Sequence, residues 1–258
     1  MDDGFMFLMQ KATDVTADDL PHVLAFPDRT APTVRAMMIA SVDGSATIGR
    51  RSGMLGGDGD HLVFHTVRRL ADVIVVGAQT AVDEGYGPGV PDGDTPPTPL
   101  VLTSRTLALP DDFTTVAAPN VLIATCTAAP ADARRRLTSA GATIVDCGTD
   151  DVDPVVLVAE LASRGLTRID LEGGPRLLAA FAAAGVLDQL VLTVSPTLAL
   201  GDAPRIAHGA ATPIRDQDLA LPFRLPYPMR ATTVLGDHEG FLYQLWEAVP
   251  DSDTTSGR

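Results

Sequence analysis

The chain has 258 residues, 45% of which are hydrophobic, and this suits a folded protein of one large domain or two small ones. Its formal net charge of −14 argues against a non-specific nucleic-acid or anionic-membrane surface. Two cysteines, Cys126 and Cys147, provide neither a disulfide framework nor a set of zinc ligands. We recognise no secretory signal and no apolar run long enough to span a bilayer, so we expect a cytoplasmic protein.

The composition along the chain predicts one main domain over residues 33–249. Residues 1–32 contain Pro21, Pro27 and Pro32, and they predict an irregular N-terminal extension that packs on this domain. Residues 250–258 are polar and predict a disordered tail.

Strands and helices alternate along most of the main domain. Buried strands are predicted over residues 33–41, 72–77, 100–104, 120–126, 142–148 and 169–171. Helices are predicted over residues 60–71, 78–85, 129–141 and 153–165, and from residue 175 onward. This alternation predicts an α/β fold with a mostly parallel central sheet and helices on both of its faces. Glycine-rich or Pro/Gly/Asp-rich loops separate some elements, over residues 43–59 and 86–99.

The alternation of strands and helices ends after residue 186. Three segments, residues 186–196, 222–237 and 240–249, have little helical pattern and read as strands joined without helices. We therefore expect all three to be antiparallel and to extend one edge of the sheet.

The stretch "EGGP" at residues 172–175 joins a buried strand to a helix. Proline suits the first helical turn, since its missing N–H would have no partner there. Gly173 and Gly174 allow a close approach of the backbone or a positive φ angle. The free N–H groups of the following helical turn favour an anion. The stretch therefore predicts either a phosphate site or a simple packing turn.

Other polar or glycine signals follow the strands, in "SVDG" (41–44), "GAQT" (77–80) and "TSR" (103–105). Each of them alone fits an ordinary turn or a solvated loop. In a parallel sheet, however, ligands bind beyond the carboxyl ends of the strands, where these signals meet. Ser104 and Arg105 suit a ribose 2′-phosphate, so together with the glycines they indicate NADPH in preference to NADH.

Four stretches resemble the riboflavin-biosynthesis pyrimidine reductases, which in many bacteria form the C-terminal half of a bifunctional deaminase-reductase. They are "IASVDGSATIG", "ADVIVVGAQTAVDE", "LVLTSRTLALP" and "EGGPRLLAAFAAAGVLDQLVLTVSPTLALG", and the resemblance covers about residues 33–248. It implies a dihydrofolate-reductase-like fold, NADPH as hydride donor and a small-molecule substrate. It also implies a homodimer that uses residues 186–201.

The resemblance assigns roles to residues that match the family motifs. The cofactor-binding set is Ala40, Gly77, Thr80, Ser104, Arg105, Glu172, Gly173, Gly174, Pro175 and Leu177. The substrate-binding set is Met37, Ser41 and Asp43, with Asp43 also expected to be catalytic, because a carboxylate can orient an amino-substituted ring and aid proton delivery. The loop from Ser45 to Gly57 is expected to close over the nicotinamide.

Departures from the family pattern fall on the substrate side. Met37 stands where the family often has lysine, and the segment after Asp83 lacks the P-x-L-T that helps hold a ribose phosphate. A pterin-like substrate such as dihydrofolate, a non-catalytic dimeric NADPH-binding module and a phosphosugar-binding protein without nucleotide therefore stay open. No zinc-deaminase motif is present, which excludes deamination.

A pair of histidines and a pair of arginines on the helix predicted over residues 60–71 need separate interpretation. His61 and His65 have a spacing that can bind a metal, but no third ligand is evident, so we expect no metal site. Arg68 and Arg69 fit either solvent or a substrate phosphate.

Overall fold

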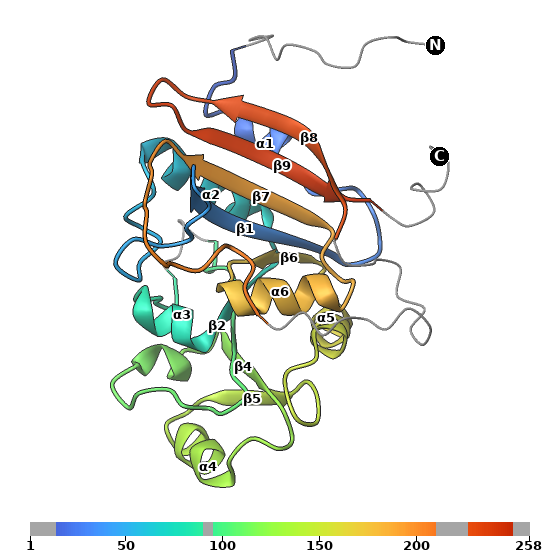
Figure 1. Cartoon of the computed structure of the whole chain (residues 1–258). Coiled ribbons are helices and arrows are strands. Elements are labelled where there is room, and N and C mark those ends of the chain that lie inside the picture. Colours follow the sequence, from blue (N-terminus) through green and yellow to red (C-terminus); the bar gives the residue numbers. More distant parts are fainter. Residues whose placement is uncertain (1–13, 90–94, 210–226, 250–258) are drawn as a thin grey trace, which may run out of the picture.

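The computed structural model describes residues 14–89, 95–209 and 227–249 (Figure 1). In this part of the chain a nine-stranded sheet has the order β5-β4-β3-β2-β6-β1-β7-β9-β8. The strands are β1 (Thr33–Ser41), β2 (Val73–Gly77), β3 (Leu100–Thr103), β4 (Val121–Thr125), β5 (Thr143–Asp146), β6 (Arg168–Leu171), β7 (Gln189–Ser195), β8 (Met229–Gly236) and β9 (Leu242–Ala248). The helices are α1 (Leu20–Val23), α2 (Asp58–Leu70), α3 (Ala78–Asp83), α4 (Ala131–Ser139), α5 (Pro154–Ser163), α6 (Pro175–Ala183) and the 3-10 helix η1 (Thr114–Ala117).

The predicted α/β class and mostly parallel sheet are confirmed. Strands β1 to β7 pair in parallel throughout, and β8 and β9 form the predicted antiparallel edge. The antiparallel prediction for β7 is confirmed on one side only: β7 pairs antiparallel with β9, but in parallel with β1, from Arg35 opposite Gln189 to Ser41 opposite Ser195. The reason is α6, which carries the chain across β1, so that β7 re-enters the sheet in the direction of β6.

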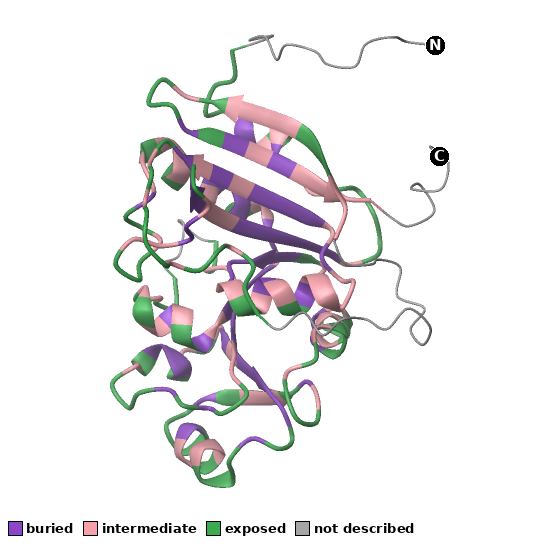
Figure 2. Ribbon diagram, in the orientation of Figure 1, coloured by how far each residue is buried: buried purple, intermediate pink, exposed green. Residues whose placement is uncertain are grey.

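Helices cover both faces of the sheet, as alternating strand residues require. Val73 and Val75 of β2 belong to the core under α5 and α6, whereas Ile74 and Val76 belong to a core with α3 and α4. A third apolar cluster packs α1 and α2 against β1, β7 and β9. Figure 2 shows that the central strands are almost continuously buried. A strand that is buried on both faces has an almost continuous run of apolar residues, so the sequence alone predicted these strands.

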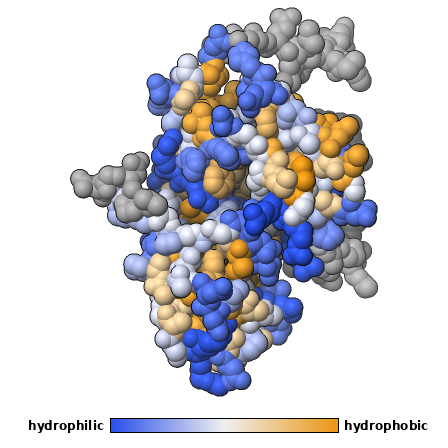
Figure 3. Space-filling model, turned by 90° about the vertical axis from the view of Figure 1, so that its left-hand side faces the viewer, coloured by the Kyte–Doolittle hydropathy of each residue, from blue (hydrophilic) through white to orange (hydrophobic). Residues whose placement is uncertain are grey.

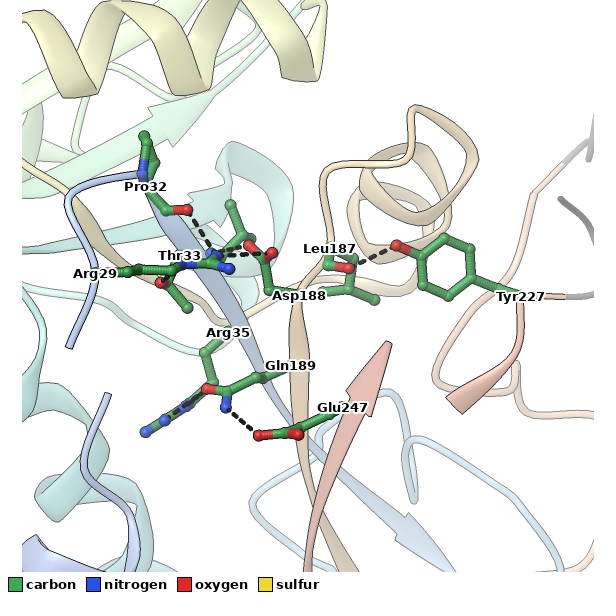
Figure 4. Close-up of polar contacts among 10 residues, drawn as sticks. Arg29, Pro32, Thr33, Arg35, Leu187, Asp188, Gln189, Tyr227 and Glu247 are labelled. Carbon is green, nitrogen blue, oxygen red and sulfur yellow. Dashed lines mark hydrogen bonds and ion pairs between the residues drawn. The ribbon is translucent and has the colours of Figure 1, made fainter. Parts of the chain in front are cut away.

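A buried arginine near the start of β1, Arg35, belongs to a hydrogen-bonded chain that links β1, β7 and β9 (Figure 4). The guanidinium of Arg35 is fully buried and donates to Oε1 of Gln189 at 2.9 and 2.6 Å and to the carbonyl oxygen of Ala25 at 2.9 Å. Gln189 in turn donates from Nε2 to Glu247 of β9 at 3.2 Å. Burial lowers the pKa of Arg35 to about 10, and the charges of Asp170 and Glu247 oppose that effect. These contacts fix the register of β1, β7 and β9.

The segment before β1 is not wholly irregular where it is described. Residues 20–23 form α1, and Leu20 and Leu24 are buried against α2. The rest of the predicted extension up to residue 13, and the whole predicted tail from residue 250, lie outside the described residues. Within the described ranges, no helix combines the length and the apolar character that crossing a membrane demands.

Candidate active site

A cavity of about 900 Å³ opens where the carboxyl ends of β1, β2 and β6 meet. Its walls come from the end of β1, the glycine-rich loop before α2, α2 itself, α3 with the loop that follows it, and the turn between β6 and α6. Figure 3 shows a hollow in the middle of this face, where hydrophilic and hydrophobic surfaces adjoin. A cavity of this size can hold a small heterocycle together with part of a nucleotide.

The turn between β6 and α6 forms one wall of the cavity. Gly173 has a φ angle of 83°, the peptide bond between Gly173 and Gly174 is cis, and Pro175 begins α6. The N–H of Gly77 donates to the carbonyl oxygen of Gly173 at 2.7 Å. A Cβ atom on Gly174 would lie only 2.6 Å from Oγ1 of Thr80. Gly174 is therefore required by the close approach of Thr80 on α3, and Gly173 by its positive φ angle, so that backbone is brought up to the cavity beside Thr80.

A charged pair joins this turn to α2. Glu172 accepts two hydrogen bonds from Arg68, at 2.5 and 2.6 Å, and one from the hydroxyl of Tyr86 at 2.6 Å. The Glu172 side chain is 1% exposed, so it is a buried carboxylate with three donated hydrogen bonds. Burial acts to lower the pKa of Arg68, but the hydrogen bonds and charge of Glu172 outweigh it and raise that pKa. Burial, and then the charge of Glu172, raise the pKa of Tyr86 well above its usual value, so its phenol stays a donor.

A second carboxyl group lies beneath this pair. Asp170 of β6 is fully buried opposite Arg35 of β1 and Ile74 of β2, and neither of its carboxyl oxygens has a hydrogen-bond partner among the described residues. Burial, followed by the charge of Glu172, raises the pKa of Asp170 well above its usual value. Burial therefore favours the neutral form of Asp170.

Asp60 is a third carboxyl group, and it lies in the cavity wall on α2. It is half-buried and follows the same helical stripe as the buried Val63 and Val67. Oδ1 of Asp60 is buried without a hydrogen-bond partner in the described part of the chain, and so is Oγ1 of Thr193 on β7. Burial raises the pKa of Asp60, while Thr193 and His61 offset part of the effect. Asp60 thus places a half-buried carboxyl group in the cavity wall, with one of its two oxygens shielded from solvent.

Asp43, the expected catalytic residue, does not line the cavity. Its exposed carboxylate accepts from the hydroxyl of Ser41 and from the N–H groups of Ala199 and Leu200, at 3.1 and 2.8 Å. These three donors lower the pKa of Asp43 to about 2. The hydroxyl oxygen of Ser41 also accepts from the N–H of Ser45 at 2.9 Å. Asp43 therefore fastens the turn after β1 to the segment after β7, and Ser41 braces that turn from within.

The other predicted site residues divide into two groups. Of these residues, the structure places Met37, Thr80, Glu172, Gly174 and Pro175 in the cavity wall. The residues that do not line the cavity are Ala40, Ser41, Asp43, Gly77, Ser104, Arg105, Gly173 and Leu177. Oγ of Ser104 accepts from the N–H of Leu107 at 3.0 Å, and Arg105 is exposed on the surface.

Sequence reasoning missed Asp60, Tyr86 and Asp170. Tyr86 stands in a Pro/Gly-rich loop with no periodic pattern, so nothing local marked it. Asp60 did carry a signal, because an acid that shares an apolar helical stripe with Val63 and Val67 faces the protein interior. In the described residues, no group of three or more His, Cys, Asp or Glu side chains is placed to hold a metal ion.

Fold and cavity together define an α/β protein of the dihydrofolate-reductase-like class, with a cavity at the carboxyl ends of its parallel strands. The chain belongs to the RibD C-terminal domain family, whose model matches residues 32–219. This confirms the resemblance to riboflavin-biosynthesis pyrimidine reductases and makes the chain an oxidoreductase of that kind.

Individual relatives agree with the family. The chain is 28% identical over 180 residues, 66% of its length and 80% of the relative's, to the 2,5-diamino-6-ribosylamino-4(3H)-pyrimidinone 5′-phosphate reductase of Methanothermobacter thermautotrophicus. The structure of a pyrimidine reductase-like protein from Corynebacterium diphtheriae is 25% identical in sequence and has a TM-score of 0.76. The match covers 92% of this chain and 100% of that one. The fold is shared with the riboflavin biosynthesis reductase Rib7 of Saccharomyces cerevisiae, at 13% identity and a TM-score of 0.59, over 90% of this chain and 96% of that one.

Proposed function

We propose that the chain is an NADPH-dependent reductase of a diaminopyrimidine of the riboflavin-pathway type. The observation that carries the proposal is one cavity with two kinds of wall. Backbone and Thr80 at the glycine turn form one wall, and the carboxyl group of Asp60 stands in another. The first suits a nucleotide phosphate and the second suits an amino-substituted ring.

The glycine turn and its neighbours fit the nicotinamide cofactor. Gly77, Gly173 and Gly174 keep the turn free of side chains, and Thr80 adds a hydroxyl donor at the same place. We assign the pyrophosphate and the nicotinamide ribose to this wall, with Pro175 and Leu177 fixing the start of α6. When bound, NADPH would supply the hydride.

Two side chains after β3 are assigned to the far end of the cofactor. Ser104 and the exposed guanidinium of Arg105 suit the adenosine 2′-phosphate, which distinguishes NADPH from NADH.

Asp60 is the group we assign to substrate recognition and proton delivery. A carboxyl group can pair with an amino group and an adjacent ring nitrogen by two hydrogen bonds. Hydride addition also requires a proton at the reduced position, and a buried carboxyl with a raised pKa holds one at higher pH than an ordinary aspartate does. Asp43, with its pKa of about 2, is poorly suited to that task, and we assign it a positioning role.

Glu172, Arg68 and Tyr86 support the reacting end of the cavity. Their mutual hydrogen bonds hold the carboxylate in one orientation, with Arg68 4.2 Å above the ring of Phe64. A preorganised polar group of this kind costs no reorganisation when substrate binds. The apolar side chains of Met37 and Phe64 in the same walls exclude water from the ring.

A dihydrofolate-type substrate is the second candidate. It is favoured by Met37, which places a thioether in the wall where the family often has lysine.

A homodimer is also proposed. It is supported by exposed apolar side chains on the turns after β1 and β7, since Val42, Leu198 and Leu200 are 62%, 66% and 73% exposed. Light scattering during gel filtration would check the homodimer.

The function is tested in two steps. Calorimetric titration with NADPH and NADH should show clearly tighter binding of NADPH. NADPH oxidation should then be followed with the riboflavin-pathway pyrimidine phosphate and with dihydrofolate. Turnover of either compound, the pyrimidine phosphate or dihydrofolate, identifies the substrate class. NADPH binding without turnover of either would favour a non-catalytic module. If neither nucleotide binds, the reductase proposal fails.

A further inference from the structure

The hairpin formed by β8 and β9 packs against the first turn of α2. Phe241 and Tyr243, at the start of β9, have stacked rings whose centroids are 6.3 Å apart. Both side chains are buried, and they share an apolar cluster with Val63 and Val67 of α2. The function proposed above assigns no role to this hairpin.

Two glycines let the hairpin approach the helix closely. A Cβ atom on Gly57, the N-cap residue of α2, would lie 3.0 Å from the ring of Phe241. A Cβ atom on Gly59 would overlap the hydroxyl oxygen of Tyr243 and would lie 2.8 Å from Oδ2 of Asp237. The hydroxyl of the tyrosine therefore lies directly against helix backbone that carries no side chain.

Asp237, in the turn of the hairpin, fixes the direction of the Tyr243 hydroxyl. Oδ2 of Asp237 accepts a hydrogen bond from that hydroxyl, and Oδ1 accepts from the N–H groups of Glu239 and Phe241 at 2.9 and 3.0 Å. Burial acts to raise the pKa of Asp237, but these hydrogen bonds outweigh it and lower that pKa. Burial, and then the hydrogen bond to Asp237, raise the pKa of Tyr243. The pair is therefore a carboxylate that holds a neutral phenol.

This contact lies beside Asp60, the next residue after Gly59. A second link runs through β7, where Thr193 is directly opposite Tyr243 in the sheet. Thr193 is buried, and it offsets part of the effect of burial on the pKa of Asp60. The hairpin thus meets the surroundings of Asp60 both along α2 and across the sheet.

We propose that Tyr243 and Asp237 are positioning residues of the active site. The phenol, held by the carboxylate, fixes the first turn of α2 at Gly59 and thereby fixes the direction and the burial of the Asp60 carboxyl group. Neither Tyr243 nor Asp237 lines the cavity, so both act on substrate only through Asp60. The inference rests on the proposed function, because Asp60 is the group assigned there to substrate recognition and proton delivery.

The kinetic test uses Tyr243→Phe, which removes a hydroxyl and no charge. We expect kcat/KM to fall about 10-fold, because a displaced catalytic group loses its alignment with the substrate. Burial raises the pKa of Asp60, so water that enters a loosened turn would lower it. The decline of kcat/KM with rising pH should therefore begin at lower pH than in the wild-type protein. The dissociation constant for NADPH should stay within about 2-fold.

Substitutions of Asp237 test whether the two residues act as a unit. Asp237→Ala should lower kcat/KM as much as Tyr243→Phe does, and the double variant should be no worse than either single variant. Asp237→Asn should lose clearly less, because its amide can still hydrogen-bond to the phenol. The pH profile is read from Tyr243→Phe alone, since it leaves the other titratable groups of the helix end and the turn unchanged, namely Asp58, His61, Asp237, His238 and Glu239.

Tyr227→Phe is the matched control. It removes another tyrosine hydroxyl, one that donates to the carbonyl oxygen of Leu187 at 2.5 Å, and Tyr227 does not line the cavity. This variant should have a lower unfolding temperature, with kcat/KM and its pH profile unchanged. The same pattern in Tyr243→Phe would overturn the proposal, because the tyrosine would then serve stability only.

The contact at Gly59 also predicts the sign of a stability change. Alanine in place of a helical glycine ordinarily stabilises a protein. Gly59→Ala should instead lower the unfolding temperature, because its methyl group would overlap the Tyr243 hydroxyl. The loss should be smaller when Gly59→Ala is made in the Tyr243→Phe background. A higher unfolding temperature in Gly59→Ala would overturn the contact and the proposal with it.

Direct titration of Asp60 separates failure of this inference from failure of the proposed function. NMR of protein with isotope-labelled aspartate carboxyl groups follows the Asp60 signal, which is identified by its loss in Asp60→Asn, and needs no turnover. A lower titration midpoint in Tyr243→Phe, without reduction of any ring by the wild-type protein, would leave the positioning role standing and remove the reductase. An equal midpoint in an enzyme that does reduce its substrate would remove the positioning role alone.

Discussion

Asp170 and Glu172 stand two residues apart, and only Glu172 has hydrogen-bond donors among the described residues. Arg68 and Tyr86 donate to Glu172, whereas Asp170 is fully buried and both of its carboxyl oxygens are unpartnered there. Burial, followed by the charge of Glu172, raises the pKa of Asp170 well above its usual value. The neutral form of Asp170 is therefore favoured beside the ion pair of Glu172 and Arg68.

Asp170 should make the protein less stable at alkaline pH. Its pKa is raised in the folded state, so the folded protein holds a proton that the unfolded chain releases, and stability is lost as pH rises through the folded-state pKa. Asp170→Asn cannot ionise and should flatten this decline. Urea unfolding at pH 5, 7 and 9 measures it. The exposed Asp112→Asn is the control, and a wild-type curve that stays flat up to pH 9 would contradict the assignment.

Asp60→Asn should lower turnover by about 10²-fold or more, because it removes the proton donor but keeps the shape of the side chain. The dissociation constant for NADPH should stay within about 2-fold. In the wild-type protein, kcat/KM should fall as pH rises through the raised pKa of Asp60, since the protonated form is the active one. Stopped-flow or steady-state NADPH oxidation from pH 5 to 9 checks both points. Full activity of Asp60→Asn would refute the role.

Asp43→Ala should loosen the segment after β7 and leave the chemistry itself intact. The N–H groups of Ala199 and Leu200 lose their acceptor, so their amide hydrogens should exchange faster. Because the folded-state pKa of Asp43 is lowered to about 2, its stabilising contribution is present above the usual pKa of aspartate and is lost as pH falls toward 2. Hydrogen exchange followed by mass spectrometry tests the first point. A loss of turnover as large as that of Asp60→Asn would return the catalytic role to Asp43.

Gly174→Ala should weaken NADPH binding, because the new methyl group would lie 2.6 Å from Oγ1 of Thr80. Overpacking of this kind costs about 1–3 kcal/mol of stability. The double variant with Thr80→Ala removes the clashing oxygen and should recover the stability but not the full affinity, since Thr80 is assigned to the phosphates. Gly209→Ala is the control, since its added Cβ meets only the Cβ of Ala179, at 3.7 Å, and Gly209 does not line the cavity. Thermal unfolding and calorimetry measure the two effects.

Arg68→Ala should be more damaging than Tyr86→Phe. Removing Arg68 leaves Glu172 buried and without its ion-pair partner, which costs about 3–5 kcal/mol. Removing the Tyr86 hydroxyl deletes one hydrogen bond to a charged group, at about 1.5–3 kcal/mol. Urea unfolding of the two variants gives the order. Equal losses would mean that Arg68 and Tyr86 do not act on Glu172 as described.

The sequence by itself determined most of the local structure. Apolar runs and helical spacing predicted β1 to β6 and α2 to α6, because burial of a strand or a helix face is written in the spacing of neighbouring residues. The glycine turn before Pro175 was also predicted from the sequence, because two glycines followed by a proline are typical of a tight turn that enters a helix. The motifs around these elements carried the family resemblance, which the family match confirms.

Only the tertiary structure decided how distant segments meet. The parallel pairing of β7 depends on α6 crossing β1, and no pattern within residues 189–195 records that path. The ion pair that brings Arg68 to Glu172 joins residues 104 positions apart, and Tyr86 reaches the same carboxylate across 86 positions. Packing of segments that are distant in the sequence also places Asp60 in the cavity wall and Asp43 outside it. Such contacts arise from packing of whole elements, so the residue types indicated a site while the fold decided which carboxyl group faces it.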